Sequence, residues 1–215
     1  MRLEKPPQVQ SNIDIAPVEM YEEARRYFMG KGRLNKTLAR ITTDLEEHGI
    51  QYAVIGATAL LAHGYPRLTE DIDLLMTCEG LEKFHAELIG VGYAPAFPGA
   101  KKRLRSTVDG VSIEVMTTGE YPGDGKPKPV SMPDPATAST EIGGIRFVTL
   151  EKLIELKLAS GISAPHRLKD LADVQELIKI KKLDADFANK LDPYVRPKFL
   201  ELQDAVSKSE LIQEK

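Results

Sequence analysis

The alternation of apolar and polar positions divides the chain into a mixed N-terminal part and a helical C-terminal part. Short apolar runs predict strands over 51–56, 71–76 and 145–150. Apolar residues spaced three or four apart predict helices over 17–29, 34–48, 57–63, 79–93, 150–160, 167–181, 184–191 and 195–210. We therefore expect an α+β fold, with a small mixed sheet flanked by helices, followed by a helical segment.

A β-hairpin is predicted around Asp109-Gly110, because alternating runs flank a dipeptide that favours a two-residue turn. Such a turn pairs Val108 with Val111, and counting outward pairs Arg105 with Glu114. Two interpretations of Glu114 follow. It forms a surface ion pair with Arg105, or it lies on a strand beside the acidic strand 71–76.

The segment 120–140 is rich in proline and has no regular periodicity, which predicts a long irregular loop. Loops of this length are often functional. It is either a surface crossover or a lid that brings Lys126 and Lys128 to an anionic ligand.

Composition adds limits on the class of protein. The chain has 215 residues, 42% hydrophobic and 28% charged, with a net charge of −3. These values are ordinary for a globular protein and give no global basic field for nucleic acid. The single cysteine, Cys78, excludes a disulfide framework. Without a long apolar run or a signal-peptide pattern, we expect no membrane contact and a cytoplasmic location. We divide the chain into an N-terminal arm at 1–16, an α+β domain at 17–148 and a helical segment at 149–215.

Two aspartates interrupt the apolar strand 71–76. Asp71 and Asp73 are two positions apart, so their side chains share one face of the strand, roughly 7 Å from each other. Carboxylates held this close suit a divalent cation with oxygen ligands, although many such pairs are ordinary solvated strand ends. Glu114 would be the third ligand if its strand lies beside Asp73.

Residues upstream of the aspartates could bind phosphate. Gly56 ends one strand, and Ala57 and Thr58 begin a helix, where free backbone N–H groups favour an anion. Arg67 precedes the acidic strand and could bind a phosphate in a bidentate manner. A plain strand-to-helix turn and a solvated arginine are the competing interpretations.

Lys157 stands out by helical geometry. It falls in the apolar stripe of helix 150–160, seven residues after Leu150. A buried ammonium is unfavourable without a partner, so Lys157 either extends to the helix edge or reaches a carboxylate or phosphate. Asp170 lies on the flank of the next helix, where it has a site role or stabilises the helix dipole, and Asp173 is expected to point away from the core.

Together these residues resemble the DNA polymerase beta-type nucleotidyltransferase superfamily, and in particular its small AbiEii-type and minimal prokaryotic members. Their pattern of a glycine turn followed by R-x-T-x-D-I-D-L is similar to "GATALLAHGYPRLTEDIDL" here. A downstream lysine and R-x-K-D-x-x-D are similar to "LEKLIELKLASG" and "HRLKDLADVQEL". The matching residues are Gly56, Arg67, Thr69, Asp71, Asp73, Leu74, Lys157, Arg167, Asp170 and Asp173.

The resemblance implies a palm-type sheet and Mg²⁺-dependent transfer of a nucleoside monophosphate from an NTP to a hydroxyl acceptor. Asp71, Asp73 and Glu114 would hold the metal, and Lys157 would act with them at the reacting phosphate. Substrate contacts would come from Gly56, Ala57, Thr58, Arg67, Thr69, Arg105 and Asp170. The acceptor would be an RNA such as tRNA, a protein or a small molecule, and a toxin–antitoxin protein partner is also implied.

This chain departs from the family pattern at two positions. Ala57 replaces the family's second glycine or serine, although Thr58 could supply a phosphate contact, and Glu114 replaces a frequent aspartate. A catalytically degenerate binding or regulatory module is therefore the alternative. A D-x-D glycosyltransferase is less favoured, because it would need a larger sugar-nucleotide domain.

Overall fold

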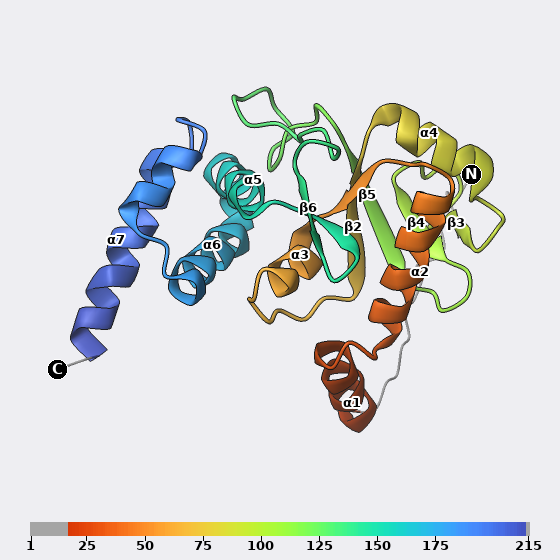
Figure 1. Ribbon diagram of the computed structural model, residues 1–215, viewed down its shortest axis with the longest axis horizontal. Helices are drawn as coiled ribbons and strands as arrows, with labels where there is room; N and C mark the ends of the chain where they lie inside the picture. Colours follow the sequence, from red (N-terminus) through yellow and green to blue (C-terminus); the bar gives the residue numbers. More distant parts are fainter. Residues whose placement is uncertain (1–16, 214–215) are drawn as a thin grey trace, which may run out of the picture.

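A mixed β-sheet forms the centre of the computed structural model, which describes residues 17–213 (Figure 1). Seven strands of the described chain pair in the order β3-β4-β5-β2-β1-β7-β6. Their bounds are β1 Tyr52–Val54, β2 Asp71–Met76, β3 Tyr93–Pro95, β4 Arg103–Ser106, β5 Ser112–Thr117, β6 Ser139–Ile142 and β7 Ile145–Val148. The predicted arm at 1–16 lies outside the described residues.

Helices cover the sheet and extend beyond it. They are α1 Pro17–Phe28, α2 Arg33–Glu47, α3 Gly56–Ala62, α4 Cys78–Glu87, α5 Leu150–Ser163, α6 Leu168–Lys181 and α7 Arg196–Gln213, with 3-10 turns at Pro165–Arg167 and Ala185–Lys190. In Figure 1, α2 and α4 lie on one side of the sheet, and α5, α6 and α7 follow one another outward on the other. The α+β prediction with a C-terminal helical segment is confirmed.

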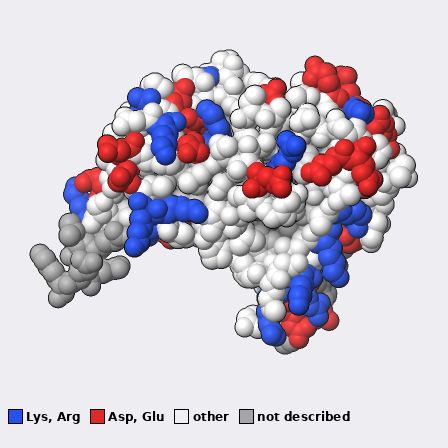
Figure 2. Space-filling model, viewed as in Figure 1, with Lys and Arg blue, Asp and Glu red and all other residues white. Residues whose placement is uncertain are grey.

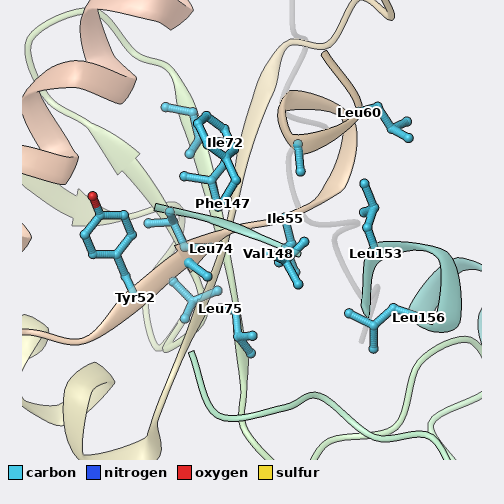
Figure 3. Packing of buried hydrophobic residues seen from close by; sticks show 14 of the residues in the cluster. Tyr52, Ile55, Leu60, Ile72, Leu74, Leu75, Phe147, Val148, Leu153 and Leu156 are labelled. Carbon is cyan, nitrogen blue, oxygen red and sulfur yellow. The ribbon is translucent and has the colours of Figure 1, made fainter. Parts of the chain in front are cut away.

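The apolar pattern explains how these elements pack. In β2, Ile72 and Leu74 are fully buried, as the alternation predicts, and Leu75 and Met76 are buried too. The α2 stripe buries Ile41 and Leu45 completely against the sheet. Figure 3 shows apolar side chains of β1, β2, β7 and α5 meeting in one cluster. This core holds β1 and β2 in place. The candidate site residues lie on β2 and just after the end of β1.

The helical segment joins the core through α5. The Thr149 side chain caps α5 by accepting a hydrogen bond from the Lys152 backbone N–H at 3.4 Å. Gly161 lets α6 approach α5 closely, since a Cβ there would lie only 2.5 Å from Leu171 Cγ. The close approach of the two helices places Asp170 and Asp173 of α6 next to Lys157 of α5.

Several predicted boundaries were wrong. Helix α4 ends at Glu87, earlier than the predicted 93, and the two short strands β3 and β6 were not predicted. The edge strand β6 is polar and pairs with β7 through a turn at Gly143 and Gly144, both with positive φ. No helix between residues 17 and 213 has the length and apolar character needed to cross a membrane.

The predicted hairpin register was also wrong. Arg105 lies opposite Ser112, and Arg103 lies opposite Glu114, a shift of two residues. Asp109 accepts hydrogen bonds from Thr37 and Arg40 of α2, and these tertiary contacts favour a longer loop over a two-residue turn.

The close α5–α6 contact generates a stability prediction. Gly161→Ala should lower the free energy of unfolding by about 1–3 kcal/mol, because the new methyl group overlaps Leu171. In a Leu171→Ala background the same change should instead stabilise by about 1 kcal/mol, since alanine favours helix over glycine. Urea denaturation of the four proteins measures both values, and equal effects in the two backgrounds would contradict the proposed contact.

Candidate active site

Strand pairing brings the predicted acidic residues together. Strands β2 and β5 are parallel, and Asp73 lies directly opposite Glu114. Asp71 is opposite Ser112, and its side chain shares the Asp73 face of β2. The interpretation that places Glu114 beside the acidic strand is therefore confirmed, although its role there stays a prediction.

Gly56 lies against Asp73 and begins α3. The Ile55 N–H donates to the Asp73 carbonyl at 2.9 Å, which holds the two strand ends together. Gly56 has a φ of 65°, and a Cβ there would overlap the Asp73 carboxylate, with Asp73 Cγ only 2.6 Å away. No side chain larger than hydrogen fits this position while Asp73 keeps its place.

The helix that follows contributes less than expected. Ala57 lines the cleft beside Gly56. Thr58 is buried, does not line the cleft, and its Oγ1 has no hydrogen-bond partner among the described residues. In this arrangement Thr58 does not supply the side-chain contact that a family serine would make.

Arg67 and Thr69 approach the aspartates from the preceding loop. The Thr69 hydroxyl donates to Asp71 Oδ1, which orients that carboxylate. Arg67 Nη1 donates to Asp173 Oδ2, and the Arg67 side chain is 18% exposed. Arg67 thus links the loop before β2 to α6.

Lys157 occupies a buried ionic cluster. Its side chain is 8% exposed, and Nζ lies 3.0 Å from Asp170 Oδ1 and 2.7 Å from Asp173 Oδ2. Lys157 therefore reaches carboxylates, one of the two outcomes that the sequence left open. Asp170 also accepts from Ser160 at 2.7 Å and from Arg167 at 3.0 Å.

We call Arg67, Lys157, Arg167, Asp170 and Asp173 the ionic cluster. Three cations and two anions give it one excess positive charge next to the acidic strands. Burial alone would raise the pKa of Asp170, but Lys157, Ser160 and Arg167 hold it below its ordinary value. The positive charges of Lys157 and Arg167 also act on Asp73 of the neighbouring acidic strand.

These groups line one cleft of about 980 Å³. Its walls come from β2, β5, the start of α3, the loop before β2, the loop after β5, and α5 with α6. Of the predicted site residues, Gly56, Ala57, Arg67, Thr69, Asp71, Asp73, Glu114, Lys157 and Asp170 line it. Arg105 and Thr58 do not.

The ionisation of Asp73 reflects this crowding. Burial, followed by the negative charges of Asp71 and Glu114, raises the pKa of Asp73 to about 7, against the opposing effect of Lys157 and Arg167. Carboxyl groups whose pKa is raised this far by burial and by neighbouring charges are frequent in functional clefts.

The donor set suits a hard divalent cation, since three carboxylates line one cleft on adjacent strands. Among residues 17–213, however, no three acidic, histidine or cysteine side chains are placed closely enough to hold a metal ion as they stand. Glu114 Oε1 lies 3.5 Å from Arg103 Nε in an exposed ion pair. Such pairs are weak, so Glu114 can leave it at little cost.

The loop lysines do not face the cleft. Lys128 Nζ donates to the Pro122 carbonyl at 2.8 Å and to Asp124 at 2.7 Å within its own loop. The exposed Lys126 does not line the cleft either. In this arrangement neither lysine is presented to the cleft, and Tyr121, Pro122, Gly123 and Met132 are the loop residues that line it.

Sequence reasoning missed the role of Asp173. It is 2% exposed and bonds both Lys157 and Arg67, although helical periodicity placed it away from the core. Two signals were available, its match to the last position of R-x-K-D-x-x-D and its three-residue spacing from Asp170, because residues at i and i+3 share a helix face. Tyr121 and Ser160 had no comparable signal.

Comparison with known proteins gave similarity only among solved structures. No protein-family model and no curated protein matches the chain. ANT(2")-Ia in complex with adenylyl-2"-tobramycin is 15% identical over 81% of this chain and 97% of that one, with a TM-score of 0.49. JHP933 from Helicobacter pylori is 19% identical over 83% and 93%, with a TM-score of 0.43. An antigenic nucleotidyltransferase-like protein from Paracoccidioides brasiliensis is 16% identical over 67% and 74%, with a TM-score of 0.43. At such identities and scores no family is established, and the function has to be argued from the site.

Replacing Gly56 should damage fold and site together. Gly56→Ala should lower the free energy of unfolding by about 2 kcal/mol or more, from the positive φ and the overlap with Asp73. Guanidinium denaturation measures the loss. Gly90→Ala is the matched control, because it has a positive φ and no atom within 4 Å of the added Cβ. Equal losses at the two positions would contradict the overlap.

Removing the Asp73 charge should stabilise the metal-free protein. The folded pKa of about 7 exceeds the unfolded value, so the folded state binds more protons between them and stability falls as pH rises. Asp73→Asn in EDTA should add nothing near pH 4 and on the order of 4 kcal/mol near pH 8, since one pKa unit corresponds to about 1.4 kcal/mol. Thermal and urea unfolding across this range measure the gain.

Asp109→Asn is a control variant in which the change in stability should have the opposite sign. Burial acts to raise the pKa of Asp109, but hydrogen bonds led by that of Thr37 hold it below its usual value. The variant should therefore lose stability above the unfolded pKa, and the loss should disappear as pH falls through the folded pKa. A pH-independent effect of Asp73→Asn would refute the assigned repulsion.

Proposed function

We propose that this protein transfers a nucleoside monophosphate from an NTP to an acceptor hydroxyl in an Mg²⁺-dependent reaction. The observation that carries the proposal is the acidic face formed by Asp71, Asp73 and Glu114 on two parallel strands. This face lies inside a cleft that the cations of the ionic cluster also line. This arrangement pairs metal-binding oxygens with positive charge for phosphates. The sequence resemblance to polymerase beta-type nucleotidyltransferases supports the same reaction.

In the proposed reaction the acceptor oxygen bonds to the α-phosphorus while the bond from that phosphorus to the β-bridging oxygen breaks. Pyrophosphate leaves with the bridging electrons. Mg²⁺ held by the three carboxylates would offset phosphate charge and favour ionisation of the acceptor hydroxyl. Glu114, whose side chain is 44% exposed, is the carboxylate best placed to accept the hydroxyl proton.

The other wall of the cleft would position the triphosphate. Gly56 and Ala57 line the cleft at the start of α3, so a phosphate oxygen can approach the backbone N–H groups there. Lys157 and Arg67 are held by Asp170 and Asp173, and the cluster keeps one excess positive charge for the developing negative charge. Asp173 is here a positioning residue for both cations.

The surface charge favours an anionic acceptor such as RNA. Lys and Arg side chains gather over α1 and the adjoining end of α2 (Figure 2). Four of them are exposed and have no ion-pair partner within residues 17–213, namely Arg25, Lys31, Arg33 and Lys36. Arg33 also lines the cleft, which joins this basic strip to the acidic strands. The strip contrasts with the net charge of −3 for the whole chain.

A binding module without transferase activity is the second candidate, and one observation favours it. Ala57 replaces the family's second glycine or serine, and the neighbouring Thr58 is buried away from the cleft. Such a module would bind NTP without transferring it, and would act through a protein partner of the toxin–antitoxin kind.

Titration and transfer assays separate these possibilities. We expect the wild-type protein to bind Mg²⁺–NTP in calorimetry and to transfer label from an α-phosphate-labelled NTP to total cellular RNA. Asp71→Asn combined with Asp73→Asn should lower transfer by roughly a hundredfold or more, since outer partners of metal ligands alone account for about 10- to 100-fold. Asp204→Asn on α7 is the acidic control outside the cleft and should change nothing.

Three outcomes decide between the candidates. Transfer that is lost in the double variant supports the enzyme. NTP binding without transfer to RNA, protein or small-molecule acceptors supports the binding module. Failure to bind any NTP overturns both.

A further inference from the structure

The loop between β5 and β6 is closed at its neck. The Gly119 N–H donates to the Met132 carbonyl at 2.8 Å, and the Met132 N–H donates to the Glu120 carbonyl at 2.7 Å. The Thr118 hydroxyl also donates to the Pro133 carbonyl at 3.1 Å. These bonds place Met132 next to the start of the loop and fix both strands of the neck.

The body of the loop is seated on α5. Gly123 has a φ of 78°, and a Cβ there would lie 2.8 Å from the Ser160 carbonyl oxygen. Pro122 is buried, and its carbonyl accepts from Lys128 at 2.8 Å and from Ser163 at 3.4 Å. Lys128 Nζ also lies 5.7 Å from the centre of the Tyr121 ring. Tyr121 is therefore part of a fixed wall of the cleft.

Next to the acidic strands this wall forms an apolar sector. Its lining side chains are Met116 of β5, Tyr121 and Met132 of the loop, and Leu153 and Leu156 of α5. Met116 follows Glu114 by two residues, so it lies on the same strand face about 7 Å further along. The side chains that line the cleft thus change from charged to apolar within about the length of a sugar.

We propose that this apolar sector binds the base of the NTP, with Tyr121 stacking on the ring. The inference rests on the proposed function and adds the position of the base to it. An NTP changes along its length as the cleft does, with a charged triphosphate at one end and a flat, uncharged aromatic ring at the other. Stacking on a fixed aromatic side chain binds a base without the entropic cost of ordering a mobile loop.

The chemistry of the sector also sets the preference among bases. Two thioethers and two leucines offer contact area but no strong hydrogen-bond donor or acceptor to read a base edge. Contact area favours the larger ring, so purine nucleotides bind more tightly than pyrimidine nucleotides. Adenine and guanine differ little in area and are distinguished weakly.

The test compares NTPs with inorganic tripolyphosphate, which has the charges of an NTP tail and no base. In calorimetry with Mg²⁺, Tyr121→Ala should weaken ATP and GTP binding by roughly 5- to 100-fold, because base stacking is lost. Tripolyphosphate binding should stay unchanged. Tyr121→Phe keeps the ring and should bind ATP like the wild type. Met132→Ala is an independent second variant and should weaken ATP binding with the same selectivity.

Controls distinguish a specific loss of base binding from a loss of folding and from a failure of the proposed function. Tyr194→Ala removes another half-buried tyrosine outside the cleft and should leave ATP binding unchanged. Near-ultraviolet circular dichroism and melting temperature confirm that each variant is folded. ATP binding that is unchanged in Tyr121→Ala and Met132→Ala overturns the base site and leaves the proposed function standing. Equal loss of ATP and tripolyphosphate binding also overturns it, and no binding of either ligand by the wild type overturns both proposals.

Discussion

The contact between Gly56 and Asp73 is the constraint on which the candidate site depends. Asp73 projects from β2 into the space that a side chain at Gly56 would occupy, so the end of β1 and the middle of β2 are fitted to each other. The same position sets Asp73 opposite Glu114 and under the start of α3. The acidic side chain of Asp73, the end of β1 and the start of α3 are thereby arranged by one backbone position that only glycine satisfies.

The ionic cluster extends this arrangement to the helical segment. Asp173 joins Arg67, from the loop before β2, to Lys157 of α5, while Asp170 adds Arg167. Buried charges are retained only when each is compensated, and removing one partner commonly costs about 3–5 kcal/mol. The cluster therefore fixes how α5 and α6 sit relative to the acidic strands, and the polar groups of three distant segments face one cleft.

Most candidate site residues named from the sequence line one cleft, some of them placed by periodicity and others by resemblance to a known motif. Alternation in β2 placed Asp71 and Asp73 on one face, and the position of Lys157 in an apolar stripe left two outcomes, extension to the helix edge or contact with a carboxylate or phosphate. Asp173 was missed because α6 packs against both α5 and Arg67, so a single core stripe does not describe it. The predicted pairing of Arg105 with Glu114 was wrong because Asp109 contacts α2, a long-range interaction that local turn preferences do not include.

The parallel pairing of β2 with β5 determines how much of the chain is needed to form the acidic face. Parallel strands need a crossover, and here α4, β3 and β4 lie between the two acidic strands. The charge-bearing face forms only after this long segment has closed, which carries a loop-closure entropy cost. No fragment that ends before β5 contains the three-carboxylate face, because Glu114 lies on that strand.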